Sequence, residues 1–326
     1  MPLPKLKKYM GRNPCPKDMD SFWDASLAEM RRTDARVELR PAAFKAPGAE
    51  CFDLHFTGVR GARVYAKYLR PKGATTRSAR SRHGADGGLP AVLLFHGYSG
   101  SSGDWFDKLA WVSLGFCVAA LDCRGQGGRS QDAGAVRGNT HHGHIIRGLD
   151  EDSPTRMLFR DIFLDTAQLA GIVMAFPEVD PKRVGATGGS QGGGLTLACA
   201  SLEPRIKRAA PVFPFLCDYK RVWELDLAKD AYQELKTYFR LFDPCHERED
   251  EIFTKLGYID CQHLAKRIRG DILMAVGLMD TICPPSSQFA AYNKIRAKKQ
   301  MVLYPDFSHE GLPRMSDRIF EFMLGL

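Results

Sequence analysis

The chain has 326 residues, of which 44% are hydrophobic, and a formal net charge of +8. This length and composition suit one large globular domain, and no apolar run reaches the ~18 to 20 residues of a membrane span. The excess positive charge lies in one segment, since residues 60–82 hold eight Lys and Arg and no acidic residue. We therefore expect a basic surface loop rather than a protein that binds nucleic acid or a membrane.

The nine cysteines form no Cys-x-x-Cys pair, and their number is odd. Cys117, Cys123 and Cys199 stand in apolar stretches, which is typical of reduced thiols in a core. Together with the lack of an apolar leader, this pattern predicts a cytoplasmic location.

Residues 1–89 are predicted to form an N-terminal extension. Apolar residues at helical spacing predict a helix over 18–32. The polar, basic and Gly/Ser-rich segment 72–89 predicts a flexible loop. The strands predicted in this extension cover 37–44, 50–59 and 63–69.

From residue 91 onward, short apolar stretches alternate with helical patterns, which predicts an α/β domain with a mostly parallel sheet and helices on both faces. The helical pattern at 221–242 interrupts the alternation and predicts a helical insertion over about 217–258 that acts as a cap. The predicted strands are 91–95, 116–121, 184–187, 209–213, 272–277 and 301–304. The predicted helices are 105–114, 156–176, 193–202, 288–296 and 313–323.

A Gly-x-Ser-x-Gly segment at 188–192 stands between a predicted strand and a predicted helix. In that setting the segment is typical of the nucleophile elbow of α/β-hydrolases. Gly188 and Gly192 leave room for a sharp turn, and the helix N-terminus beyond it favours developing negative charge at Ser190. The alternative is a glycine-rich turn that carries an ordinary serine.

A serine becomes a nucleophile when a base takes its proton and an acceptor orients that base. Asp280 follows a predicted strand, and His309 follows the last predicted strand after a short loop. The chain order Ser190, Asp280, His309 is that of the α/β-hydrolases. The alternatives are that Asp280 caps the next helix and that His309 is a surface histidine.

An oxyanion hole needs two backbone N–H donors, one from the residue after the nucleophile and one from a loop after an early strand. Gln191 is the first candidate. Tyr98 is the second, because it follows Gly97 directly after the strand predicted at 91–95. Tyr98 can alternatively be a packing aromatic.

Three histidines lie close together in the sequence at His141, His142 and His144. No Cys or carboxylate stands at a usual metal-ligand spacing from them, so we expect no metal. The chain also lacks a phosphate-binding Gly-x-x-x-x-Gly-Lys loop and a His-Glu-x-x-His helix, and we expect no cofactor.

Three segments resemble the signatures of carbohydrate esterase family 7, which contains acetyl xylan esterases and cephalosporin C deacetylases. They are RGQGG at 124–128, GGSQG at 188–192 and HE at 309–310. Further matches to the family pattern lie at 96–98, 102–105, 143–148 and 280–285. The resemblance spans nearly the whole chain.

The resemblance implies one α/β-hydrolase domain over residues 1–326. It assigns Ser190, Asp280 and His309 to the catalytic triad and Tyr98 and Gln191 to the oxyanion hole. It also implies substrate contacts at three aromatic residues, which are Tyr98, Trp105 and Tyr232.

The resemblance further implies a serine esterase that acts on acetyl esters of small carbohydrates such as xylo-oligosaccharides, and on cephalosporin C. The family is intracellular and forms homo-hexamers whose active sites face an internal cavity. One departure is Ala231-Tyr232, where the family usually has Pro-Tyr near the acyl pocket, so the acyl preference stays open. A second is the long basic loop at 72–89.

Two other functions share parts of this pattern. A peptidase of the prolyl-oligopeptidase kind has the same elbow and triad order, but it generally carries a large N-terminal propeller. Residues 1–89 are too few for such a propeller. A hydrolase-fold binding protein that has lost catalysis is expected to have a broken triad, whereas all three residues are present here.

Overall fold

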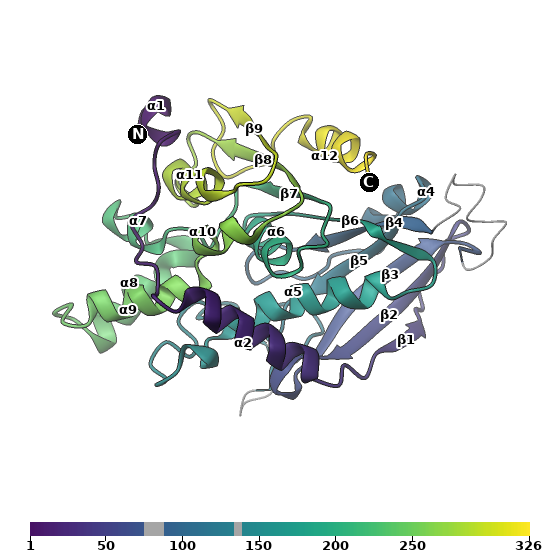
Figure 1. Ribbon diagram of the computed structural model, residues 1–326, viewed down its shortest axis with the longest axis horizontal. Helices are drawn as coiled ribbons and strands as arrows, with labels where there is room; N and C mark the ends of the chain where they lie inside the picture. The colour runs from purple at the N-terminus through teal and green to yellow at the C-terminus, as the bar shows by residue number, and fades with distance from the viewer. Residues whose placement is uncertain (75–87, 134–138) are drawn as a thin grey trace.

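The computed structural model describes residues 1–74, 88–133 and 139–326, and within these residues nine strands form one sheet (Figure 1). The sheet order is β1-β2-β3-β5-β4-β6-β7-β8-β9. Strands β4 to β9 are parallel, whereas β1, β2 and β3 extend one edge with antiparallel pairing. This architecture confirms the predicted α/β class. The strands are β1 (Glu38–Pro41), β2 (Ala49–Thr57), β3 (Arg63–Pro71), β4 (Leu89–Phe95), β5 (Cys117–Asp122), β6 (Val179–Gly189), β7 (Arg208–Val212), β8 (Asp271–Gly277) and β9 (Lys299–Tyr304).

Helices cover both faces of the sheet (Figure 1). Within the described residues, none of them is long and apolar enough to cross a membrane. The α-helices are α1 (Leu3–Leu6), α2 (Met19–Arg32), α4 (Leu109–Ser113), α5 (Leu158–Met174), α6 (Gln191–Leu202), α7 (Tyr219–Glu224), α8 (Gln233–Phe242), α9 (Glu249–Leu256), α10 (Cys261–Leu264), α11 (Pro285–Lys294) and α12 (Met315–Met323).

The central strands are apolar on both faces, as expected for parallel strands covered on two sides. Alternate residues of β4 show this, because Leu93 belongs to the large core beneath α5 and α6 while Val92 packs with Val112 of α4. Successive side chains point to opposite faces of the sheet because a strand is pleated. The sheet thus presents the carboxyl ends of its parallel strands at one edge, where sites in such folds form.

The N-terminal extension follows the predicted elements with shifted ends. Helix α2 packs on α5, with Trp23 fully buried and its ring stacked on Phe163 at 5.9 Å between centroids. Strand β1 is shorter than the predicted 37–44, because the chain turns after it and pairs Ala46 with Ala49. Most of the loop predicted at 72–89 lies outside the described residues.

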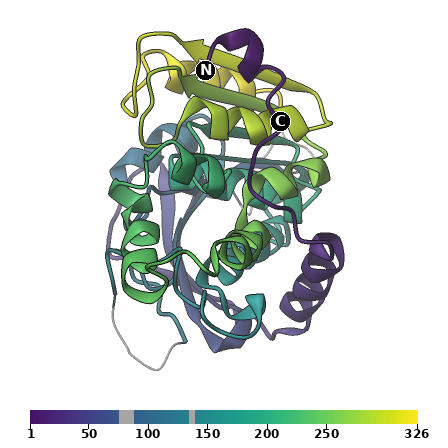
Figure 2. The same cartoon turned by 90° about the vertical axis from the view of Figure 1, so that its left-hand side faces the viewer.

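The segment between β7 and β8 is helical and contains α7, α8, α9 and α10 (Figure 2, green). Its amphipathic helix α8 buries Leu235, Tyr238 and Phe239. The first-turn residue Glu234 is also buried, which is unusual for a carboxylate. This segment therefore brings polar as well as apolar groups toward the carboxyl edge of the sheet.

Candidate active site

Ser190 occupies a sharp turn between β6 and α6. Its backbone is in a strained region with φ of 57° and ψ of −120°. A Cβ at Gly188 would come within 2.5 Å of the Phe95 carbonyl oxygen, and a Cβ at Gly192 would collide with the same group. These two glycines therefore let β4 and the elbow pack closely. Helix α6 begins at Gln191, two residues before the predicted start, because the turn passes directly into the helix.

Ser190, His309 and Asp280 form a continuous hydrogen-bonded chain. Ser190 Oγ lies 3.0 Å from His309 Nε2, and His309 Nδ1 lies 2.9 Å from Asp280 Oδ2. Asp280 is 3% exposed, so its carboxylate faces the imidazole with little competition from water. Asp280 lies 90 positions after Ser190, and His309 lies 29 positions after Asp280. The fold thus brings the three residues together in the geometry that activates a serine.

Asp280 also stabilises the turn in which it lies. Strand β8 ends at Gly277, and Asp280 Oδ1 accepts hydrogen bonds from Ile282 N at 2.9 Å and Cys283 N at 2.8 Å. One carboxylate oxygen is thereby held by the backbone while the other is directed at His309. The capping alternative and the triad hypothesis are compatible here, because each uses a different oxygen.

Donor atoms of Asp280, Cys283 and His309 lie within 4.8 Å of one another. Two of these residues, Asp280 and His309, are hydrogen-bonded to each other, so the group overlaps the candidate triad. Burial raises the pKa of the Cys283 thiol well above its usual value, so the thiol is neutral.

Tyr98 lies in the loop after β4 and Gln191 is the first residue of α6, which are the two places expected to hold an oxyanion. Gln126 links these loops: its side-chain oxygen accepts from Ser99 N at 3.0 Å, and its amide pairs with the Gln191 amide at 2.9 to 3.0 Å. Gln126 and Gln191 are both 0% exposed. Gln126 was not predicted as a site residue, although it lies within the RGQGG signature that the resemblance uses.

Two of the predicted substrate contacts have packing partners in the structure. Trp105 stacks on Phe44 with centroids 6.1 Å apart and lies under Lys67 Nζ at 5.4 Å, so it contacts the N-terminal part of the chain. Tyr232 is 0% exposed and packs on Phe215 at 4.3 Å. Its hydroxyl has no hydrogen-bond partner within the described part of the chain. For both residues, a contact with substrate stays a prediction.

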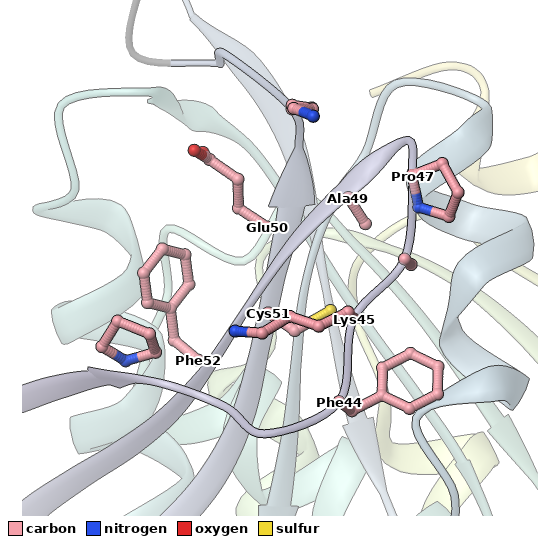
Figure 3. Close-up of a pocket in the computed structure, with 10 residues that line it drawn as sticks. Phe44, Lys45, Pro47, Ala49, Glu50, Cys51 and Phe52 are labelled. Atoms are coloured by element: carbon pink, nitrogen blue, oxygen red, sulfur yellow. The ribbon is translucent and has the colours of Figure 1, made fainter.

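The surface also carries a hollow of about 560 Å³ near the turn between β1 and β2 (Figure 3). Phe44 and Phe52 bring apolar rings to it, and Lys45 and Glu50 bring charge. None of the triad residues lines this hollow. It is therefore a feature of the N-terminal extension and separate from the candidate active site.

The mostly parallel sheet, with a strained serine between a strand and a helix, makes the protein an α/β-hydrolase, and Ser190, Asp280 and His309 have the arrangement of a serine triad. Comparison with protein-family models gives a more specific assignment than this class. A model of the acetyl xylan esterase (AXE1) family matches residues 1–326, so the chain belongs to that family. This confirms the resemblance proposed from the sequence, and it makes the chain a carboxylic ester hydrolase.

Two solved structures and one further relative agree with this assignment. Acetyl xylan esterase 1 from Thermoanaerobacterium sp. JW/SL YS485 is 60% identical, with a TM-score of 0.93 over 100% of this chain and 98% of its own. Acetyl xylan esterase from Paenibacillus sp. R4 is 35% identical, with a TM-score of 0.90 over 100% of this chain and 99% of its own. Acetyl esterase Axe7A of Xylanibacter ruminicola is 25% identical over 94% of this chain, which spans 66% of that longer protein.

Proposed function

We propose that this chain hydrolyses acetyl esters of small carbohydrates, xylo-oligosaccharides foremost, through an acyl-enzyme on Ser190. The observation that carries the proposal is the hydrogen-bonded chain from Asp280 through His309 to Ser190, in a member of the acetyl xylan esterase family. The relatives named as acetyl xylan esterases support the acetyl group and the xylan-derived alcohol.

In the first half of the reaction, Ser190 Oγ attacks the acetyl carbonyl while His309 Nε2 takes the hydroxyl proton. Asp280 accepts the Nδ1 hydrogen bond, which fixes the imidazole tautomer and stabilises the imidazolium that forms. The backbone N–H groups of Tyr98 and Gln191 donate to the oxyanion. His309 then returns the proton to the departing sugar hydroxyl, which leaves acetyl-Ser190.

In the second half, a water molecule takes the place of the sugar. His309 removes a proton from this water, which attacks the acetyl-Ser190 carbonyl. The same two N–H groups hold the second oxyanion, and His309 protonates Ser190 Oγ as acetate leaves. The residues named above complete the catalytic cycle, and no step in it is a redox step.

The wider substrate range and the assembly rest on the family resemblance alone. Cephalosporin C carries an acetyl ester of suitable size and belongs in the substrate panel. A homo-hexamer and a cytoplasmic location also stay predictions. Light scattering of the purified chain measures the oligomeric state.

The proposal is tested by Ser190→Ala with acetylated xylo-oligosaccharide and with 4-nitrophenyl acetate. Loss of a triad serine lowers kcat by roughly 10⁶ in a serine hydrolase, so we expect acetate release to fall to background. Ser201→Ala is the matched control, because Ser201 is a buried serine of α6, the helix that follows Ser190, and its hydroxyl donates to Leu197 O at 2.7 Å.

Undiminished activity of Ser190→Ala would contradict the proposal. Two further assays separate the alternatives. Cleavage of a Pro-containing peptide without acetate release would favour a peptidase, and failure of a fluorophosphonate to label the wild-type chain would favour a protein without catalysis.

A further inference from the structure

The side chain of Tyr98 is held at its far end by the inserted helical segment. Its ring packs edge-on against Phe215 at 5.6 Å and His144 at 5.0 Å between centroids. Its hydroxyl donates a hydrogen bond to Glu234 Oε1 and accepts one from His144 N at 3.3 Å. The residue whose backbone N–H we propose as an oxyanion donor therefore has its side chain fixed by Glu234.

Glu234 makes further contacts with the loop at 143–148. Its other oxygen, Oε2, accepts hydrogen bonds from Ile145 N at 2.8 Å and Ile146 N at 3.1 Å. The residue is 7% exposed and stands in the first turn of α8. One buried carboxylate thus accepts from three donors that belong to two different loops.

We propose that Glu234 is a positioning residue for ester hydrolysis, which holds Tyr98 and the loop at 143–148 so that the Tyr98 N–H points at the oxyanion. The inference rests on the function proposed above. A donor stabilises the transition state only when it is held at the right place before the reaction begins, and loss of one donor costs roughly 10²- to 10³-fold in kcat. A donor that is kept but loosely oriented is expected to cost part of that range.

The charge of Glu234 makes this role dependent on pH. Burial raises the pKa of Glu234 to about 7, and the hydrogen bonds from Tyr98 and the loop together with the Arg147 charge oppose that rise. Burial also raises the pKa of Tyr98 and lowers that of His144 to about 4, so both neighbours stay neutral near pH 7. Among the residues that the structure describes, Arg147, His142 and Asp230 are further ionisable groups near Glu234.

Above pH 7 the carboxylate is charged and accepts from all three donors. Below pH 7 one oxygen carries a proton, so Glu234 then offers the same mixture of donor and acceptor as a glutamine. The variant Glu234→Gln therefore imitates the protonated wild type at every pH.

The test compares kcat and KM for 4-nitrophenyl acetate in the wild type and in Glu234→Gln across pH. We expect kcat of the variant to be about tenfold lower at about pH 8.5 with KM nearly unchanged, and the two kcat values to converge toward about pH 5.5. Tyr98→Phe, which keeps Glu234 but removes the donor hydroxyl, is expected to lose activity as well. The double variant is expected to lose less than the product of the two single losses.

Glu178→Gln is the matched control. Glu178 is 1% exposed and likewise accepts a tyrosine hydroxyl, from Tyr68 at 2.7 Å, but it contacts none of the proposed site residues. We expect its kcat ratio to the wild type to be the same at every pH. Thermal unfolding of each variant checks that it is folded. If Glu234→Gln does not fold, Tyr98→Phe serves as the test.

Two results overturn the role of Glu234 while leaving the esterase function intact. They are equal kcat of wild type and Glu234→Gln at all pH values, and a loss that does not change with pH. Absence of acetate release from the wild type would instead contradict the proposed function, and the role of Glu234 would fall with it.

Discussion

At the scale of the residue, the proposed oxyanion hole depends on side chains that never touch the ester. Gln126 is the clearest case, because its amide joins the segment after β4 to the start of α6. A buried amide that is hydrogen-bonded through both its oxygen and its nitrogen restricts the arrangement of its neighbours. The two proposed N–H donors come from the loop after β4 and from the start of α6, so their spacing depends on such links.

We expect Gln126→Ala to lower kcat for 4-nitrophenyl acetate by about tenfold or more, as part of the 10² to 10³ assigned to one oxyanion donor. The physical reason is the loss of the bond to Ser99 N and of the amide pair with Gln191. Steady-state kinetics measures the change. Gln168→Ala is the control, since Gln168 is a buried glutamine that instead bonds Thr57 O at 2.9 Å. Equal effects of the two substitutions would contradict the prediction.

At the scale of the element, the elbow works because β4, β6 and α6 approach each other closely. Gly192 lies at the point of contact, where the carbonyl group of Phe95 leaves no room for a Cβ. The same close approach lets the strand pass into the helix at Ser190 with a strained backbone. The strain is held by bonds from Ser190 N to Val212 O and from Phe215 N to Ser190 O, each 3.0 Å long.

We therefore expect Gly192→Ala to lower the free energy of unfolding by about 3 kcal/mol or more, because the clash is with backbone rather than with a movable side chain. Urea unfolding and acetate release measure stability and activity. The matched substitution Gly48→Ala places a Cβ in open space, so its stability should be close to that of the wild type. A Gly192→Ala chain as stable and active as the wild type is the result that rules this explanation out.

At the scale of the whole molecule, one buried arginine joins distant parts of the chain. Arg124 is 0% exposed and binds Asp165 of α5 with two hydrogen bonds of 2.6 and 2.7 Å. It also donates to Val59 O at 3.2 Å and Asp161 at 3.3 Å. The N-terminal extension, the loop after β5 and helix α5 thus meet on a single guanidinium.

Replacing Arg124 by Leu leaves the buried carboxylate of Asp165 without its ion-pair partner, whereas Asp161 keeps Arg160, and we expect the free energy of unfolding to fall by about 3 to 5 kcal/mol. Arg129→Leu is the control in the same loop, because Arg129 makes an exposed ion pair with Asp53 at 2.8 Å, and such pairs contribute about 1 kcal/mol or less. Urea unfolding of the two variants gives the comparison. Similar losses in both would show that the burial of Arg124 does not matter.

Much of this protein is predictable from the sequence, and the reason is that the relevant signals are local. Apolar stretches of strand length determine β4 to β9, and the order Ser190, Asp280, His309 identifies the hydrolase class without any contact being known. Gly188 and Gly192 likewise indicate a sharp turn, because such a turn needs residues without a side chain at these two positions. The family resemblance depends on the same short signatures.

The tertiary structure alone decides which polar groups meet between those signatures. Glu234 and Tyr98 are 136 positions apart, and nothing in the helical pattern of α8 indicates that its first-turn carboxylate is buried on a tyrosine hydroxyl. The stacking of Trp105 on Phe44 of the extension is likewise a contact that only the fold shows, and its predicted contact with substrate stays a prediction. Sequence periodicity indicates which face of a helix or strand is apolar. The partner of a buried polar group depends instead on how distant elements pack, and this packing is determined only when the chain has folded.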